Sequence, residues 1–375
     1  MNVVKYGIIG AGLAWQYHRA GCKRNPKIKL VSIYDIDEKK AKRNARTFKM
    51  EAYSNLDDFF RSDIDAVIIM VPHFLHEQMV IAATEAGKHV LCEKPMATTL
   101  EGCDSMIKAT RKAGIKFMIA ENHRFLPAHQ YIMEAVQKGL IGNIFLIRAF
   151  EGVNEIPNLI KPDFWKGHPI KAGGGSLMDM GAHKFATMNW ILNDQVESAY
   201  SWITQQCTNL VEKAEDNALI MLKFKKGTIA ETVVSFTLTT PPTNSIEVYG
   251  TKGTILENHA WEKPVKINSF HKDMGDKRGL WYEPEIEHGV FPKYYEISAR
   301  IEDDYFTNCI LEDKEPEFTP EQAKVAIATV LMGYLSARTG KIATYSDLME
   351  IYQTKGTKSI LEGLEKYVQN NYLEN

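Results

Sequence analysis

The pair Asp179 and His183 lies directly after three consecutive glycines, in the stretch KAGGGSLMDMGAHKF at residues 171–185. A spacing of four residues predicts that both side chains share one helix face, about one turn apart. A carboxylate and an imidazole placed in this way can orient and accept a proton near neutral pH. The glycines let the chain pass close to a flat ligand. On these residues alone, His183 fits a general base and an ordinary packed histidine equally well.

A second pattern follows the first apolar run of the chain, where Gly10-Ala11-Gly12 opens a predicted helix. Gly10 allows a tight turn, and Gly12 lets a pyrophosphate approach the backbone N–H groups at the positive end of that helix. This placement favours dinucleotide binding over a structural turn. The third small position of the fingerprint falls on Trp15, whose indole is too large for close packing of helix against strand. We expect Ala14 to take that role.

Asp35 closes the second apolar run. A carboxylate at this point can accept hydrogen bonds from the adenosine ribose and repel a 2'-phosphate, which favours NAD over NADP. The alternative is that Asp35 or Asp37 only caps the helix that begins near Glu38.

These residues need a scaffold, and the first third of the chain predicts a parallel sheet covered by helices. Apolar runs, which are typical of buried strands, alternate with helical patterns; the runs are VVKYGII, IKLVSIY, DAVIIMV, KHVLC and IKFMIA. The helical segments include 76–87 and 100–114, and Gly114 is the expected C-cap of the second. Right-handed crossovers then give an α/β fold, a doubly wound Rossmann domain for NAD(P) over residues 1–122. Its ligand site is expected at the carboxyl ends of the strands.

Residues 123–375 predict an α+β domain for substrate binding and oligomerisation, built on a large, open and mainly antiparallel sheet. Strand-like segments recur at 143–152, 196–206, 217–224, 227–236 and 245–250, and turn residues at 225–227 and 251–253 join paired runs. Thr319 to Gln322 form a capping box at the start of a helix that ends near Gly340. One sheet face is free to pair with a second subunit. The irregular segment 257–292 carries aromatic residues that suit a sugar face or, preferably, a subunit interface.

The composition excludes several classes of protein. The chain has 375 residues, a formal charge of -2 and 25% charged residues, so it offers no broad positive field for nucleic acid. No apolar run is long enough for a membrane span, and the N-terminus lacks signal-peptide features, which predicts a cytoplasmic protein. Five scattered cysteines suit reduced thiols. We expect no metal, because His73, His76 and Glu77 match no standard ligand spacing.

The motifs together resemble the Gfo/Idh/MocA oxidoreductases, a family that includes inositol dehydrogenases and glucose-fructose oxidoreductase. The resemblance extends to about residue 190 and is carried by motifs in the expected order; these are GIIGAGLAWQYH, VPHFLHE, CEKP, ENHRFLP and AGGGSLMDMGAH. It implies an NAD-dependent enzyme that forms dimers or tetramers. It also implies a cis peptide bond between Lys94 and Pro95, and a place near the cofactor for His76, which could otherwise be a helix N-terminal histidine.

The resemblance assigns a catalytic trio. His183 would be the general base on a secondary alcohol, Asp179 would orient it or share the proton, and Lys94 would bind the same oxygen. The expected cofactor residues are Gly10, Gly12, Leu13, Ala14, Asp35, Val71, His76, Glu93 and Lys94. The expected substrate residues are Lys94, Asn122, Arg124, Trp165, Asp179 and His183, with core packing as the alternative for Trp165. Ala186 and His123 depart from the family pattern, so the ring and the position oxidised stay open.

Three functions follow from this pattern. The first is an NAD-dependent dehydrogenase that acts on a cyclic polyol, a sugar or a glycoside. The second is a hydrolase or lyase that retains NAD and works through a transient keto-sugar. The third is a non-catalytic sugar or nucleotide sensor, against which the intact trio argues.

Overall fold

The computed structural model describes residues 3–162, 164–206 and 214–372, which form two compact units. The first unit consists of residues 1–97, 101–125 and 295–324, and the second of residues 98–100, 126–294 and 325–375. The predicted domain boundary at residue 122 stays a prediction. The units differ from it in three respects, because the first unit extends to residue 125, residues 98–100 belong to the second unit, and residues 295–324 return to the first.

The first unit is built on a parallel sheet with the order β3-β2-β1-β4-β5-β6. The strands are β1 (Val4–Ile9), β2 (Ile28–Tyr34), β3 (Glu51–Tyr53), β4 (Ala66–Ile69), β5 (His89–Glu93) and β6 (Phe117–Ala120). Its helices are α1 (Trp15–Arg24), α2 (Glu38–Phe48), α3 (Leu56–Phe60), α4 (His76–Glu85), α5 (Leu100–Ala113) and α10 (Lys293–Leu311). This strand order reverses at β1, which is the doubly wound Rossmann arrangement that the sequence predicts.

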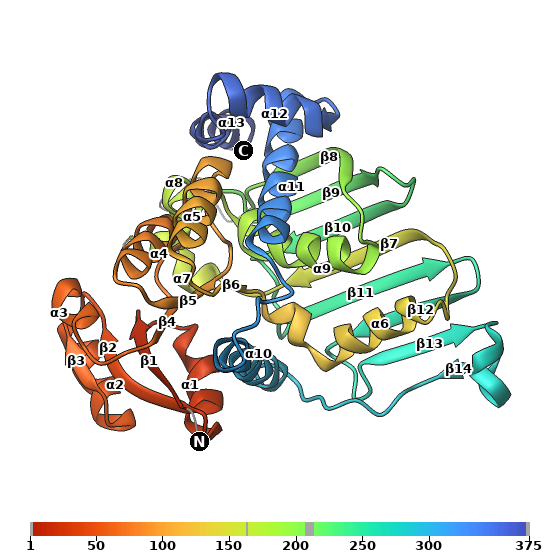
Figure 1. The fold of residues 1–375 in the computed structure, drawn as a ribbon. Coiled ribbons are helices and arrows are strands. Elements are labelled where there is room, and N and C mark those ends of the chain that lie inside the picture. The colour runs from red at the N-terminus through yellow and green to blue at the C-terminus, as the bar shows by residue number, and fades with distance from the viewer. Residues whose placement is uncertain (1–2, 163, 207–213, 373–375) are drawn as a thin grey trace. The chain divides into compact units, whose positions relative to one another are not determined.

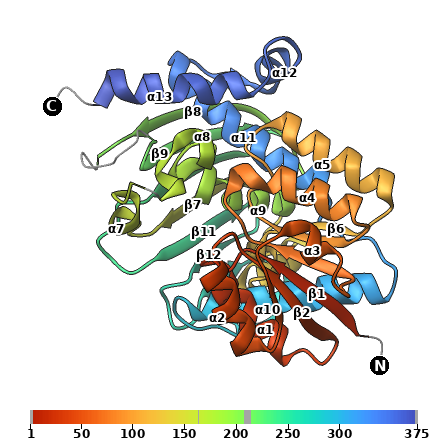
Figure 2. The same ribbon diagram turned by 90° about the vertical axis from the view of Figure 1, so that its left-hand side faces the viewer.

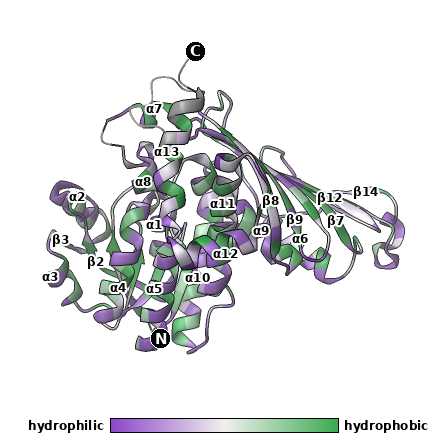
Figure 3. Ribbon diagram, turned by 90° about the horizontal axis from the view of Figure 1, so that it is seen from above, coloured by the Kyte–Doolittle hydropathy of each residue, from purple (hydrophilic) through white to green (hydrophobic). Residues whose placement is uncertain are grey.

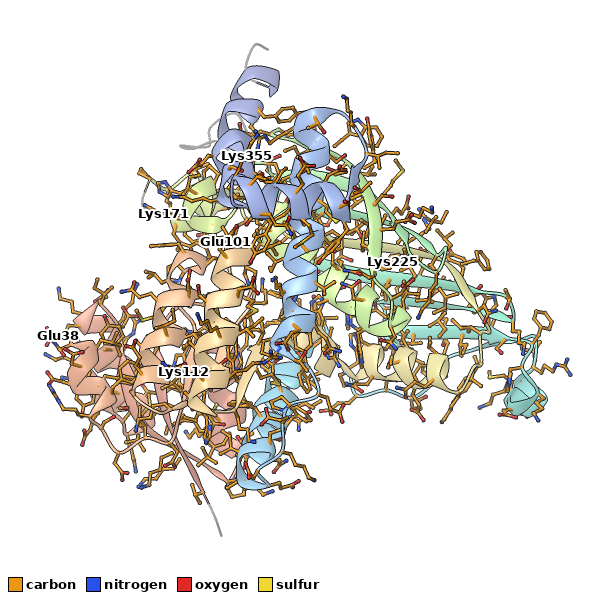
Figure 4. The ribbon with its side chains drawn as sticks, turned by 45° about the horizontal axis from the view of Figure 1, so that its top comes forward. Glu38, Glu101, Lys112, Lys171, Lys225 and Lys355 are labelled. Atoms are coloured by element: carbon orange, nitrogen blue, oxygen red, sulfur yellow. The ribbon has the colours of Figure 1, made fainter. Side chains whose placement is uncertain are left out.

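The helices of the first unit cover the sheet and end as the sequence predicts. Figure 2 shows α1 and α2 beside β1 and β2. Helix α2 is mostly hydrophilic (Figure 3), and it buries only Ala41, Asn44 and Ala45. Gly114 follows α5 with a φ of +66°, as expected of a C-cap. Glu38 begins α2 and Lys112 lies in the last turn of α5 (Figure 4), where each charge complements the helix dipole.

The second unit contains a sheet of nine strands with the order β14-β13-β12-β11-β7-β10-β9-β8-β15. The strands are β7 (Ile144–Gly152), β8 (Val196–Thr204), β9 (Asn217–Phe224), β10 (Ile229–Ser235), β11 (Thr243–Gly250), β12 (Gly253–Asn258), β13 (Val265–Ser269), β14 (Trp281–Tyr282) and β15 (Ala343–Thr344). All neighbours are antiparallel except β7 and β10. The predicted turns at 225–227 and 251–253 join β9 to β10 and β11 to β12. The large, mainly antiparallel sheet is therefore confirmed.

The remaining α-helices of the described chain are α6 (Pro127–Gln137), α7 (Ile156–Leu159), α8 (Pro169–Ala172), α9 (Ala182–Leu192), α11 (Pro320–Thr339), α12 (Tyr345–Thr354) and α13 (Lys358–Tyr372). Helices α6, α9 and α11 lie along one face of this sheet, and α12 lies at its β8–β15 edge (Figure 1). The predicted capping box forms at the start of α11, since Thr319 N–H donates to Gln322 Oε1 at 3.1 Å and Gln322 N–H donates to Thr319 Oγ1 at 3.3 Å. None of the described helices is both long enough and apolar enough to cross a membrane.

One sequence expectation needs correction. The segment 257–292 is less irregular than predicted, because β13 and β14 lie within it and extend the edge of the sheet. Trp15 begins α1, and the role expected of Ala14 stays a prediction. The Trp15 indole is buried, donates from Nε1 to Asn44 Oδ1 at 3.1 Å and packs against Phe48, so its bulk fills the space between α1 and α2.

Candidate active site

In the first unit, strand β1 is followed by a tight turn, and position 10 of this turn accepts only glycine. Gly10 has a φ of +97°, and a Cβ atom there would overlap the carbonyl group of Met70. Gly12 is exposed, and a Cβ atom there would meet nothing within 4 Å. The next residues, Leu13 and Ala14, lead into α1, and Leu13 is 65% exposed. The turn therefore leaves space for a pyrophosphate at the N-terminus of α1.

Asp35 connects this turn with the end of β2. Its Oδ2 accepts the Ala11 N–H and its Oδ1 accepts the Asp37 N–H, both at 2.8 Å. The helix cap is Asp37 instead, which accepts the N–H groups of Lys39 and Lys40. Asp35 is thus held beside the glycine turn, and its contact with a ribose hydroxyl stays a prediction.

His76 connects the segments that follow strands β4 and β5. Its buried ring places Nδ1 at 2.8 Å from the Pro95 carbonyl and Nε2 at 3.0 Å from the Val71 carbonyl. Burial lowers the pKa of His76, so the ring is neutral and donates to one carbonyl at a time. The side chain fixes the segment after β5, while direct contact of His76 or Val71 with the cofactor stays a prediction.

The peptide bond between Lys94 and Pro95 is cis, as the resemblance implies. The neighbouring Glu93 accepts the Lys94 N–H at 3.1 Å and lies 3.1 Å from Nε2 of His18. The other nitrogen of His18 lies 2.8 Å from Asp303. Burial acts to lower the pKa of His18, but the carboxylates of Asp303 and Glu93 outweigh it and raise the pKa well above its usual range. A charged imidazole therefore anchors Glu93 next to Lys94.

The predicted substrate residues of the first unit are held by α10 and the chain that follows it. Asn122 donates to Ser298 at 3.0 Å. The Arg124 guanidinium lies 4.6 Å from the centre of the Phe318 ring, and burial lowers its pKa to about 10. His123, at the position where the family pattern has arginine, is buried with Nε2 at 3.4 Å from the Tyr295 hydroxyl.

Asp179 lies in the second unit, in a π-helical turn at Leu177–Gly181 that continues directly into α9. His183 is in the first turn of α9, and the two side chains are 7% and 2% exposed. A π-helical turn of this kind widens the helix and is common at functional sites. Asp179 Oδ2 accepts a hydrogen bond from Lys166 Nζ at 2.8 Å. Trp165 precedes this lysine and is half-buried.

The glycines before this turn fit against a buried carboxylate. Glu215 accepts the Gly175 and Leu177 N–H groups at about 3.0 Å and the Tyr334 hydroxyl at 2.7 Å. A Cβ atom at Gly175 would overlap the Glu215 carbonyl, and one at Gly174, where φ is +127°, would overlap the Tyr334 hydroxyl. Burial raises the pKa of Glu215 to about 7. Because the glycines have no Cβ atoms, the backbone can approach Glu215 closely. Its hydrogen bonds to Glu215 then fix the turn that carries Asp179.

Sequence reasoning missed Lys166 and Glu215 in the second unit and His18 in the first unit. The sequence offered one indication of Lys166, because this lysine directly follows Trp165, an expected substrate residue. The sequence offered no indication of Glu215 or His18, because their hydrogen-bond partners lie far from them along the chain. Within the second unit the structure brings Asp179, His183 and Lys166 onto neighbouring segments. Lys94 belongs to the first unit, so its approach to them stays a prediction.

Comparison with known proteins decides the family. Residues 4–121 match a family model described as an oxidoreductase family with an NAD-binding Rossmann fold, and residues 129–256 match the GFO/IDH/MocA C-terminal domain. The chain belongs to the GFO/IDH/MocA oxidoreductase family. Its first unit is an NAD-binding Rossmann domain, to which the glycine turn and Asp35 are suited.

Several relatives of this GFO/IDH/MocA protein are named for a carbohydrate or a polyol. It is 32% identical to a 1,5-anhydro-D-fructose reductase from Ensifer adhaerens, over 75% of this chain and 80% of the relative. It is 27% identical to a myo-inositol 2-dehydrogenase from Thermotoga maritima, over 89% of this chain and 96% of the relative. The structure of levoglucosan dehydrogenase with NADH and levoglucosan shares the fold, with a TM-score of 0.81 and 22% identity over 92% of this chain and 100% of that chain. The protein is thus an NAD-binding oxidoreductase of the GFO/IDH/MocA family.

Proposed function

We propose that this protein transfers a hydride between a secondary alcohol of a cyclic polyol, a sugar or a glycoside and NAD. The observation that carries the proposal is the placement of Asp179 and His183, two buried polar residues. The backbone just before them is held by hydrogen bonds from the Gly175 and Leu177 N–H groups to Glu215. An NAD-binding domain and relatives that include a reductase and a dehydrogenase support the same chemistry. The bound nicotinamide accepts or returns the hydride.

Each protein residue has a distinct task in this proposal. His183 removes the hydroxyl proton, and Lys94 hydrogen-bonds the same oxygen as negative charge develops there. Asp179 orients the reacting hydroxyl, and Lys166 holds Asp179 at 2.8 Å. His18, Glu93 and the cis Lys94–Pro95 segment position Lys94.

NAD is the preferred cofactor because Asp35 presents a negative charge beside the glycine turn. A 2'-phosphate would be repelled there. Asn122, Arg124 and Trp165 are proposed to surround the substrate. The outer face of the large sheet exposes Trp202 and Met221, which are 49% and 43% accessible, and we propose that a second copy of the chain covers them.

The test is a panel of inositols, free sugars and glycosides, each with NAD and NADP in parallel. The proposal predicts growth of the reduced-nicotinamide absorbance with NAD and at least one member of the panel. Cleavage of a glycoside without net NADH would instead support the NAD-retaining hydrolase or lyase. A clear preference for NADP would contradict the role given to Asp35.

A further inference from the structure

A buried group of three side chains in the second unit lies outside the residues assigned to catalysis. It contains His129 in the first turn of α6, Glu257 near the end of β12 and His259 just after β12. Their exposed fractions are 0%, 1% and 2%. One ligand atom from each side chain lies within 4.8 Å of those of the other two. Figure 1 shows α6 beside β12, the elements that carry His129 and Glu257.

The Glu257 carboxylate is the unusual member of this group. Neither of its oxygens accepts a hydrogen bond within the described ranges of the chain. His259 Nε2 lies 3.0 Å from Oε1 and His129 Nε2 lies 3.6 Å from Oε2, close but without hydrogen-bonding alignment. A buried carboxylate with no hydrogen bond is unfavourable, so a buried charge is normally paired or coordinates a metal.

The buried cation near this group is already engaged. Lys184 is fully buried, and its ammonium donates to Asn244 and lies 3.5 Å from Glu151 Oε2. The negative charge of Glu151 therefore balances that of Lys184, and the negative charge of Glu257 is left for another cation.

We propose that His129, Glu257 and His259 form a binding site for a divalent transition metal ion, with Zn²⁺ the best fit. Two imidazoles and one carboxylate are a ligand set that zinc uses, with a fourth position for water. Zinc bonds of about 2.0–2.2 Å in a tetrahedron separate ligand atoms by roughly 3.3–3.6 Å, and the nitrogen–oxygen distances of 3.0 and 3.6 Å lie close to that value. Mg²⁺ and Ca²⁺ prefer oxygen ligands, so the two imidazoles disfavour them.

Ring stacking and backbone hydrogen bonds hold the His259 residue in place. The ring stacks on Tyr294, with 4.4 Å between centroids and 18° between planes. Its backbone N–H donates to the Asn244 carbonyl at 3.0 Å, and its carbonyl lies 3.2 Å from His288 Nε2. His288 is only half-buried, and its ring centre lies 5.4 Å from that of His259. The half-buried side chain marks the side from which an ion would enter.

The ion would connect parts of the chain that are distant in sequence. His129 belongs to α6, whereas Glu257 and His259 belong to the start of the segment 257–292. A metal bound to all three would fasten this segment and the end of β12 onto α6. The proposal is independent of the hydride-transfer function, because none of the three residues is assigned to the active site. It departs from the expectation of no metal, which considered only ligands close together in sequence.

The test begins with the full-length protein, stripped of metal by a chelator and titrated with ZnCl₂ or CoCl₂ alone. The proposal predicts stoichiometric Zn²⁺ binding, a higher thermal midpoint with Zn²⁺, and the intense visible absorption of tetrahedral Co²⁺. The variants are Glu257→Gln and His259→Gln, and the matched control is His271→Gln, a histidine of the same segment outside the site. Each site variant should lose more than the roughly 10- to 100-fold in Zn²⁺ affinity that removal of an outer-shell partner costs, and the control should bind as the wild type does.

A second measurement keeps the test valid if the variants fail to fold. Crystals of the wild type grown with Zn²⁺ should show a zinc anomalous peak between the three side chains. The proposal is overturned if stripped wild-type protein binds no Zn²⁺, if the peak lies elsewhere, or if the folded variants bind Zn²⁺ as tightly as the wild type.

Discussion

Lys166 donates a hydrogen bond from Nζ to Oδ2 of Asp179 at 2.8 Å, and both side chains lie mostly out of solvent. The lysine comes from the short segment η3 (Trp165–Gly167), and the aspartate comes from the π-helical turn. Glu155 is also near, since the Lys166 charge opposes the rise in the pKa of Glu155 that burial causes. Asp179 is thus held in one orientation by a cation that the sequence pattern does not include.

Replacement of Lys166 by Met should lower kcat/KM by about 10- to 100-fold, because a hydrogen bond to a charged group contributes roughly 1.5–3 kcal/mol. NAD affinity should not change, because the glycine turn and Asp35 belong to the other unit. Steady-state kinetics and NAD titration by fluorescence measure the two quantities. Lys171→Met is the matched control, since Lys171 is an exposed lysine of α8 (Figure 4). Equal activity of both variants and the wild type would show that the ion pair is not used.

Replacement of Gly175 by Ala should destabilise the protein by about 3 kcal/mol or more and abolish activity, because the new Cβ atom would overlap the Glu215 backbone. The thermal midpoint and turnover measure this. In the control Gly227→Ala, φ is +96° but a Cβ atom meets nothing within 4 Å, so only about 1–2 kcal/mol of backbone strain is expected. A Gly175→Ala protein as stable and active as this control would refute the role given to the close contact.

The sequence predicted the sheets well where strands are long and their side chains are uniformly apolar or regularly alternating. It missed β3, because Glu51–Tyr53 has only three residues and one of them is charged. It could not place the Trp15 indole, because the fingerprint assumes a small residue there and gives no hint that Asn44 and Phe48 contact the ring.

The candidate site shows the same limit. Asp179 and His183 were found because their partners in the pattern are close in sequence. Glu215 and Lys166 were not, because hydrogen bonds to Gly175 and Asp179 come from chain segments that only the fold brings near. The triple glycine signalled a close approach, but the sequence suggested a ligand where the structure has the Glu215 backbone and the Tyr334 hydroxyl.

Stability should depend on pH through Glu302, a fully buried residue of α10. Burial raises its pKa well above the usual range, against the opposing effect of His18. Above the ordinary glutamate pKa, the unfolded chain has released a proton that the folded chain still holds, so stability falls as the pH rises through this window, by up to about 1.4 kcal/mol per pH unit. Glu302→Gln removes this dependence, so its advantage in thermal midpoint over the wild type should grow from pH 5 to pH 8.

The exposed Glu262 supplies the control for this pH dependence. Glu262→Gln should follow the wild-type midpoint at every pH. If Glu302→Gln also kept a constant difference from the wild type, the buried carboxyl would not be the proton-binding group.

Cofactor choice should change when Asp35 is replaced. In the double variant Asp35→Ser and Ile36→Arg, the repulsive carboxylate is removed and a guanidinium is placed where Ile36 is 89% exposed. The ratio of kcat/KM for NAD to that for NADP should fall by at least about tenfold, equivalent to about 1.4 kcal/mol. Asp37→Ser, which removes only the α2 cap, should lose some stability and keep the preference. An unchanged ratio in the double variant would contradict the role of Asp35.

The most direct test of the central claim is NADH formation by Lys94→Ala and His183→Ala with whichever sugar or polyol the wild type oxidises. Loss of the general base, or of the group that stabilises the oxyanion, should lower kcat by about 10²- to 10⁴-fold, while NAD still binds. Full turnover in either variant, with its fold intact, would contradict the proposal that His183 and Lys94 act on the same hydroxyl.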